Sequence, residues 1–281
     1  PGGVIHAKAV VLATHFPIVN VPGFFFFRMH QERSYVLALE NAAPVGGMYI
    51  GEEKNSLSFR DAEGLLLFGG AGTRTGKNRE GGNFEQLMQS AKVFYPACKA
   101  VYRWAAQDCM PHDQIPYIGL LSEKWPGVYV ATGFQKWGMT SSMAAAEILT
   151  DFICGRENGD APVFSPQRFH PFVSTPKLLI DGAQTVYSIA KEKLEIPRET
   201  LFAIPNGTAA VVKVEGEKVG VYKTPDGGAY CVTVRCPHLG CRLEWNPAEL
   251  SWDCPCHGSR FDYTGKLLND PAQTGIEKAE R

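Results

Sequence analysis

Two short segments late in the chain hold residues whose types and spacing could bind a metal. They read Cys236-Pro-His238-Leu-Gly-Cys241 and Cys254-Pro-Cys256-His257-Gly-Ser259. Each segment offers a thiolate and an imidazole, and two of each make a complete ligand set for one metal centre. Such a set suits zinc, or a two-iron cluster in which one iron takes two thiolates and the other takes two histidines.

The spacing favours the second alternative. The order is C-x-H, fifteen residues, then C-x-x-H, and each segment carries one further cysteine. A zinc finger instead places its two thiolates together and its two histidines together. The arrangement resembles the Rieske [2Fe-2S] domain. The resemblance implies that Cys236 and Cys254 bind one iron, that His238 and His257 bind the other, and that Cys241 and Cys256 form a disulfide between the two loops.

Neighbouring residues match the same family, with one departure. The matches stand where the family has its cluster loops and a covering proline loop: Leu239-Gly240, Trp252-Asp253, Gly258-Ser259 and Pro271-Ala272. High-potential respiratory Rieske domains have a tyrosine two residues after the matching serine, and its hydroxyl donates to a cluster cysteine. Here the serine is Ser259 and the later residue is Phe261. We therefore expect a potential in the middle or lower part of the roughly -150 to +300 mV Rieske span.

The remaining cysteines and histidines follow no ligand spacing. We interpret the other cysteines as small buried hydrophobic side chains; they are Cys98, Cys109, Cys154 and Cys231. For the histidines outside the two segments, a structural role is a simpler interpretation than a catalytic one; they are His6, His15, His30, His112 and His170.

Composition describes an ordinary globular chain. The 281 residues are 44% apolar and 20% charged, enough for one or two cores. Lys and Arg number 28 against 29 Asp and Glu, which leaves no basic surface for a nucleic-acid partner. No apolar run approaches the ~20 residues that span a bilayer, and Phe24–Phe27 is predicted to be a short strand or loop. We expect no membrane segment and a cytoplasmic location.

The first part of the chain predicts an α/β arrangement. Ala9–Ala13 is a continuous apolar run, typical of a strand buried on both faces. Short extended segments separated by glycines then predict a twisted antiparallel sheet; they are 34–40, 48–50, 56–60 and 65–68. Asn83 is expected to cap a helix that ends at Pro96. Val128–Ala131 predicts a second buried strand, followed by a helix over about 141–154 that Gly155 ends.

The turn between that strand and helix could meet a cofactor. Gly133-Phe-Gln-Lys-Trp-Gly138-Met-Thr140 would bring backbone N–H groups at a helix start toward an electron-rich group, although a glycine-rich turn without a ligand is equally compatible with the motif alone. Trp104 and the segment 111–119 precede it in the chain. This order resembles FAD-dependent oxidoreductases of the D-amino-acid oxidase and glycine oxidase type, over about residues 4 to 155.

The resemblance implies a flavin site. Its expected contacts with the flavin ring are Gly133, Phe134, Gly138, Met139 and Thr140, and the helix dipole would stabilise the reduced flavin. The G-x-G-x-x-G fingerprint and the acidic ribose ligand are not in this chain. Because the chain begins at Pro1 in what reads as the middle of a fold, we expect a fragment that binds FAD poorly without an N-terminal half. Four arginines are candidates for anchoring substrate: Arg28, Arg33, Arg60 and Arg74.

The sequence predicts three regions. Residues 1–155 form the partial Rossmann-like FAD domain with its antiparallel substrate sheet. Residues 156–197 form a linker with several prolines and a helix over about 178–194. Residues 198–281 form a small all-β Rieske domain. Within the last region, strands are expected at 210–214, 219–222 and 230–234 around a Pro225–Gly228 turn.

Together the resemblances imply an oxidoreductase. Its flavin would accept a hydride from a small organic substrate, an amine or amino acid, and a [2Fe-2S] cluster would pass the electrons singly to an unidentified acceptor. Two alternatives stay open. The Rieske domain could be an electron carrier or redox sensor beside an idle flavin half, or it could deliver electrons to the flavin.

Overall fold

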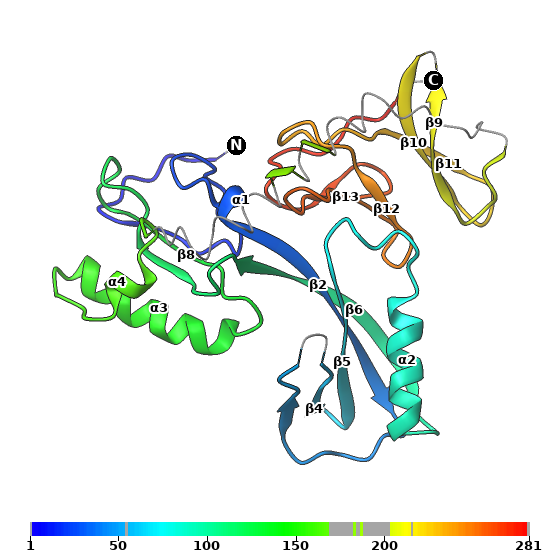
Figure 1. Ribbon diagram of the computed structural model, residues 1–281, viewed down its shortest axis with the longest axis horizontal. Coiled ribbons are helices and arrows are strands. Elements are labelled where there is room, and N and C mark those ends of the chain that lie inside the picture. Colours follow the sequence, from blue (N-terminus) through cyan, green and yellow to red (C-terminus); the bar gives the residue numbers. More distant parts are fainter. Residues whose placement is uncertain are drawn as a thin grey trace.

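The computed structural model describes residues 2–53, 56–168, 182–183, 186–187, 203–214 and 216–279. We call residues 2–168 the N-terminal part and residues 203–279 the C-terminal part. In Figure 1 the long strands β2 (Met29–Glu40) and β6 (Lys99–Pro111) run from beside α1 (Phe25–Arg28) and β8 (Val128–Thr132) down to the level of helix α2 (Asn83–Phe94). The predicted helix over 178–194 lies largely outside the described residues.

A small mixed sheet opens the N-terminal part. Strand β1 (Val10–Leu12) pairs in parallel with β8 (Val128–Thr132), which pairs antiparallel with β7 (Tyr117–Leu120). Helix α3 (Gly138–Ile153) packs on this sheet, with Ile148 buried against Ile118 and Ala131, and the short α4 (Ala161–Phe164) joins the same cluster. Both predicted strands form, but β1 is not buried on both faces, because Val10 and Val11 are exposed at this edge of the sheet. Helix α3 begins three residues before the predicted start.

The larger sheet has five strands in the order β3-β4-β5-β2-β6. Its outer strands are β3 (Met48–Ile50), β4 (Ser58–Ala62) and β5 (Leu65–Arg74), and all pairings are antiparallel, as predicted. Helix α2 covers one face, where Leu87 and Phe84 pack on Tyr35 and Phe68. Residues on β2 alternate between buried and half-buried, so that Gln31 and Arg33 share the buried face with Tyr35.

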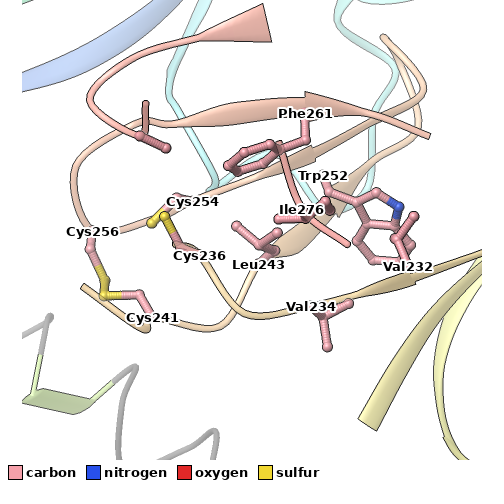
Figure 2. Packing of buried hydrophobic residues seen from close by; sticks show 11 residues of the cluster. Val232, Val234, Cys236, Cys241, Leu243, Trp252, Cys254, Cys256, Phe261 and Ile276 are labelled. Carbon is pink, nitrogen blue, oxygen red and sulfur yellow. A yellow bond between two sulfur atoms is a disulfide. The ribbon is translucent and has the colours of Figure 1, made fainter. Parts of the chain in front are cut away.

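The C-terminal part consists of two antiparallel sheets. Strands β9 (Ala209–Val214), β10 (Glu217–Lys223) and β11 (Ala229–Thr233) form the first, close to the predicted bounds. Strands β12 (Glu244–Asn246), β13 (Ser251–Asp253), β14 (Arg260–Asp262) and β15 (Leu267–Asn269) form the second. The core between them contains Trp252, Leu243 and Phe261, all fully buried (Figure 2).

Three further local predictions are wrong. Phe24–Phe27 contains helix α1 (Phe25–Arg28) rather than a strand or loop, and Phe24 before it is left-handed at φ 49°. Asn83 does not cap α2: Gly82 precedes the helix in the left-handed region, and the Asn83 side chain is buried and donates to the carbonyl of Ala71. Cys154 is exposed at the end of α3, and Cys231 is only half-buried, whereas Cys98 and Cys109 are buried as expected.

Candidate metal and flavin sites

Both cysteine and histidine segments lie at one end of the second sheet of the C-terminal part. The first loop (residues 236–241) follows β11, and the second loop (residues 254–259) joins β13 to β14. Within each loop a backbone turn is closed by an N–H donor: Gly240 donates to the carbonyl of Cys236, and Gly258 donates to that of Cys254. Two matching turns therefore present the four predicted ligands on facing loops.

The sulfur atoms gather between these loops. Figure 2 shows Cys236 and Cys254 side by side, with the bonded pair Cys241 and Cys256 next to them. The sulfur atoms of Cys241, Cys254 and Cys256 all lie within 4.8 Å of one another. Because a disulfide already joins Cys241 to Cys256, that trio cannot act as three thiolate ligands. The thiols left for metal binding in this cluster are Cys236 and Cys254.

Electrostatics distinguishes these two thiols. A hydrogen bond between them lowers the pKa of Cys236, with further help from Ser259, while the same bond and burial raise the pKa of Cys254. The hydrogen bond places a thiol proton between these two buried sulfurs. Such a pair is suited to losing that proton to a cation, because thiolates are the form that binds metal.

The two histidines complete the set. The rings of His238 and His257 meet edge to face with centroids 5.0 Å apart. Burial lowers the pKa of His238 to about 4, which favours the neutral imidazole that ligates metals. The Nδ1 atom of His238 is buried and has no hydrogen-bond partner, an unusual state for a buried nitrogen. An orphaned nitrogen beside coupled thiols fits a bound [2Fe-2S] cluster.

The predicted tuning residues also lie beside the thiols. Ser259 is fully buried; its hydroxyl oxygen accepts from the backbone N–H of Ala272 at 3.0 Å, and its hydrogen bond to Cys236 favours that thiolate. Phe261 is fully buried in the adjacent core and offers no donor.

The histidine side of this site lies against the N-terminal part. The ring of Phe26, on α1, makes edge contacts with His238 at 4.8 Å and with His257 at 5.4 Å between centroids. Phe27 approaches His257 at 6.1 Å. Sequence reasoning missed these phenylalanines, since nothing local connects residues more than 200 positions apart.

The predicted flavin segment begins directly after β8. Gly133 has φ +73°, and a Cβ there would lie 2.6 Å from the ring of Pro111, so glycine is required. Phe134 packs into the α3 cluster. Gly138 is the first residue of α3, with no side-chain cap on the helix, and Met139 is 87% exposed. Thr140 donates to the carbonyl of Trp137. The uncapped N–H groups at this helix start fit an electron-rich ring.

The four candidate arginines have different surroundings. Arg28 stacks on Tyr117 at 4.2 Å and donates to the carbonyl of Pro166. Arg33 is buried in an ion pair with Glu249 of the C-terminal part. Arg60 is exposed on β4, and Arg74 lies opposite Glu32 in the β2–β5 register. Arg28 and Arg33 are thus occupied by structural contacts.

Comparison with known proteins divides the chain into the same two parts, one with the flavin segment and one with the cysteine and histidine loops. The profile described as FAD dependent oxidoreductase matches residues 1–152, and the profile described as Rieske [2Fe-2S] domain matches residues 199–280. The chain therefore belongs to the FAD-dependent oxidoreductase family and carries a C-terminal Rieske domain. These domains imply FAD and a [2Fe-2S] cluster as cofactors. From here, "Rieske domain" denotes residues 199–280.

Individual relatives cover one or both domains. The chain is 36% identical over 274 residues to YhfW of Bacillus subtilis (strain 168), whose name assigns it to the Rieske 2Fe-2S iron-sulfur proteins; the match covers 95% of this chain and 54% of YhfW. The Rieske region is 35% identical over 94 residues to cytochrome b6-f complex iron-sulfur subunit 2 of Trichormus variabilis, covering 32% of this chain and 53% of that protein. The chain thus spans about half the length of these relatives.

One solved structure resembles the fold of the N-terminal part. Glycine oxidase from Geobacillus kaustophilus aligns with a TM-score of 0.51 and 20% identity, covering 58% of this chain and 46% of its own. At that identity the likeness concerns the fold alone.

Among the described helices, none combines the length and apolar character needed to cross a bilayer.

Proposed function

We propose that this chain belongs to a dehydrogenase that oxidises a C–N bond of an amine or amino acid. When bound, FAD supplies hydride acceptance, and the [2Fe-2S] cluster supplies one-electron acceptance toward an external acceptor. The substrate class rests on the resemblance to glycine oxidase-type enzymes.

The observation that carries the proposal is the contact between α1 and the histidines. Phe26 lies against both His238 and His257, the residues proposed to hold the second iron. This places the N-terminal part next to the proposed electron-accepting side of the cluster. The contact supports electron transfer between the oxidoreductase domain and the cluster over an independent role for the Rieske domain.

The chain's own residues would exclude water from the contact between α1 and the histidine side of the cluster site. Phe26 is 8% exposed and His257 is 5% exposed, so water is excluded between the two rings. The side chains proposed to hold the cluster are Cys236, His238, Cys254 and His257. The segment proposed to meet the flavin is 133–140, at the start of α3.

A comparison of turnover tests the proposal. The longest natural form of the protein that contains this chain, loaded with both cofactors, is given glycine, other amino acids and simple amines with a dye that accepts electrons. A Cys254→Ser variant, which should lose the cluster and keep the FAD, serves as the matched form. We expect substrate to bleach the flavin in both proteins and dye reduction to fall strongly in C254S. Equal dye reduction would favour a carrier or sensor role for the Rieske domain instead.

The direction of flow needs a separate comparison. Midpoint potentials of flavin and cluster, measured in the same preparation, should show the cluster at the higher potential. A cluster potential well below that of the flavin would favour delivery of electrons to the flavin.

A further inference from the structure

The second cluster loop is held by side chains that come from the N-terminal part. Gln31 on β2 donates through Nε2 to the carbonyl of His257 at 2.8 Å and to that of Asp270 at 2.9 Å. Asp270 precedes Pro271 in the loop that covers the cluster site. One amide therefore fixes a proposed iron ligand and the covering loop at the same time.

Gln107 on β6 adds a second support. Its Nε2 donates to the carbonyl of Gly258 at 2.9 Å and also to the side-chain oxygen of Gln31. Its own oxygen accepts from the hydroxyl of Thr75 at 3.1 Å. Gln31, Gln107 and Thr75 are 2%, 7% and 2% exposed, so the chain of amides is shielded from water. The amide nitrogens of Gln31 and Gln107 both depend on loop carbonyls as acceptors for their N–H groups.

Close packing shows that the fit is specific. Gly258 has φ +87°, and a Cβ there would lie 2.7 Å from the Cβ of Gln31. On the other side, a Cβ at Gly76, whose φ is +75°, would lie 2.4 Å from the backbone nitrogen of Pro255. Such approaches leave no room for a side chain at either glycine. The second loop is thus seated in the N-terminal part along its backbone.

We propose that Gln31 and Gln107 are positioning residues for the cluster. They hold the second loop in place and thereby set the redox potential of the cluster. The inference rests on the proposed function only through the cluster ligands, and it does not depend on the direction of electron flow. Its physical basis is the peptide backbone. The N–H groups of Cys256 and His257 are donors to the thiol of Cys254, and hydrogen bonds to sulfur stabilise the reduced cluster.

Anchoring the carbonyls keeps those N–H groups aimed at the sulfur. If Gln31 no longer holds the carbonyls of His257 and Asp270, one buried and one half-buried acceptor lose their partner, and the loop shifts to recover one. The donors to Cys254 are then less well aligned, and the reduced cluster is less stabilised. The potential should therefore fall.

The test is an EPR-monitored redox titration of the cluster-loaded protein with Gln31→Met and Gln107→Met. Methionine keeps the length of glutamine and removes its donors. Arg79→Met is the matched control, because Arg79 bonds Glu244 across the same boundary at 2.7 Å but does not touch the cluster loops. Dithionite and mediators set the potential, so neither substrate nor flavin is needed.

We expect a lower midpoint potential and altered g values in Q31M, a smaller change of the same sign in Q107M, and none in R79M. Should Q31M fail to retain iron, the milder Q107M decides. Unchanged potentials and g values in Q107M, or in a Q31M protein that keeps its cluster, would overturn this inference alone. A wild-type protein that binds zinc and no sulfide would overturn it together with the proposed function.

Discussion

Arg33 of strand β2 and Glu249 of the Rieske domain form a two-pronged ion pair across the domain boundary. Both Nε and Nη2 of Arg33 donate to the carboxylate, and the side chains are 5% and 14% exposed. Glu249 also meets Arg260 at 3.1 Å, and Arg260 in turn pairs with Asp253 at 2.9 Å. A buried network therefore continues from the five-stranded sheet into the Rieske domain.

Removing one member of this network should weaken the protein markedly. Arg33→Met leaves a buried carboxylate with one cation fewer, and such losses cost about 3 kcal/mol even at the low end. Urea unfolding should show this decrease, with partial recovery in the double variant R33M/E249M. The control is Glu85→Gln, which breaks an exposed pair with Arg103 and should change stability by less than about 1 kcal/mol. Equal effects of R33M and E85Q would contradict the account.

Phe26 should control the contact between the domains without controlling flavin chemistry. Phe26→Leu opens the packing against His238 and His257 at a cost in stability of about 1 kcal/mol. We expect slower cluster reduction after substrate is mixed with the oxidised protein, and an unchanged rate of flavin bleaching. Phe24→Leu is the matched control, since Phe24 contacts Phe26 but neither histidine. A pair of variants with identical cluster reduction rates would count against the α1 contact.

The hydroxyl of Ser259 should raise the cluster potential. Its hydrogen bond to Cys236 is worth about 1 kcal/mol, which corresponds to roughly 40 mV for a one-electron couple. Ser259→Ala should lower the midpoint potential by about that amount, and Phe261→Tyr should raise it if the added hydroxyl reaches a cluster cysteine. Redox titration of both variants measures the two shifts, and a potential in S259A equal to that of the wild type would argue against this donor.

The disulfide should stabilise the loops around the cluster. Cys241 and Cys256 are 15 residues apart, and closing a loop of that length stabilises a fold by roughly 3 kcal/mol in the chain-entropy model. The double variant C241S/C256S should lose iron faster in the presence of a chelator and unfold at lower urea. Serine at the exposed Cys154 is the control and should change neither property. Iron retention equal to wild type in the double variant would show that the bond is dispensable.

The parts of the site that sequence could predict are those that local spacing determines. A ligand set within two short loops can be predicted from sequence, because each loop must present its cysteine and histidine together. The β9–β11 strands and the helix after Gly133 follow from alternation and from glycine turns in the same way. The Rieske-domain partners of Gln31 and Arg33 lie more than 200 residues away, and no local pattern encodes them.

The wrong local predictions have tertiary causes. Phe25 is 1% exposed and packs edge to face on Tyr117, so α1 is formed by burial and not by propensity. Asparagine is a residue type suited to capping, but the side-chain amide of Asn83 donates its hydrogen bond to the carbonyl of Ala71 instead. Strand β6 was not predicted because its first half is exposed and lacks apolar alternation, and pairing with β2 forms it.

We expect electrons taken from substrate by the flavin to reach the Rieske cluster. The most direct measurement freezes the anaerobic protein at successive times after mixing with a reducing substrate and records the EPR spectrum beside the flavin absorbance. A rhombic Rieske-type signal should grow in as the flavin absorbance changes, up to one spin per cluster. A fully bleached flavin beside a cluster that stays oxidised would contradict it.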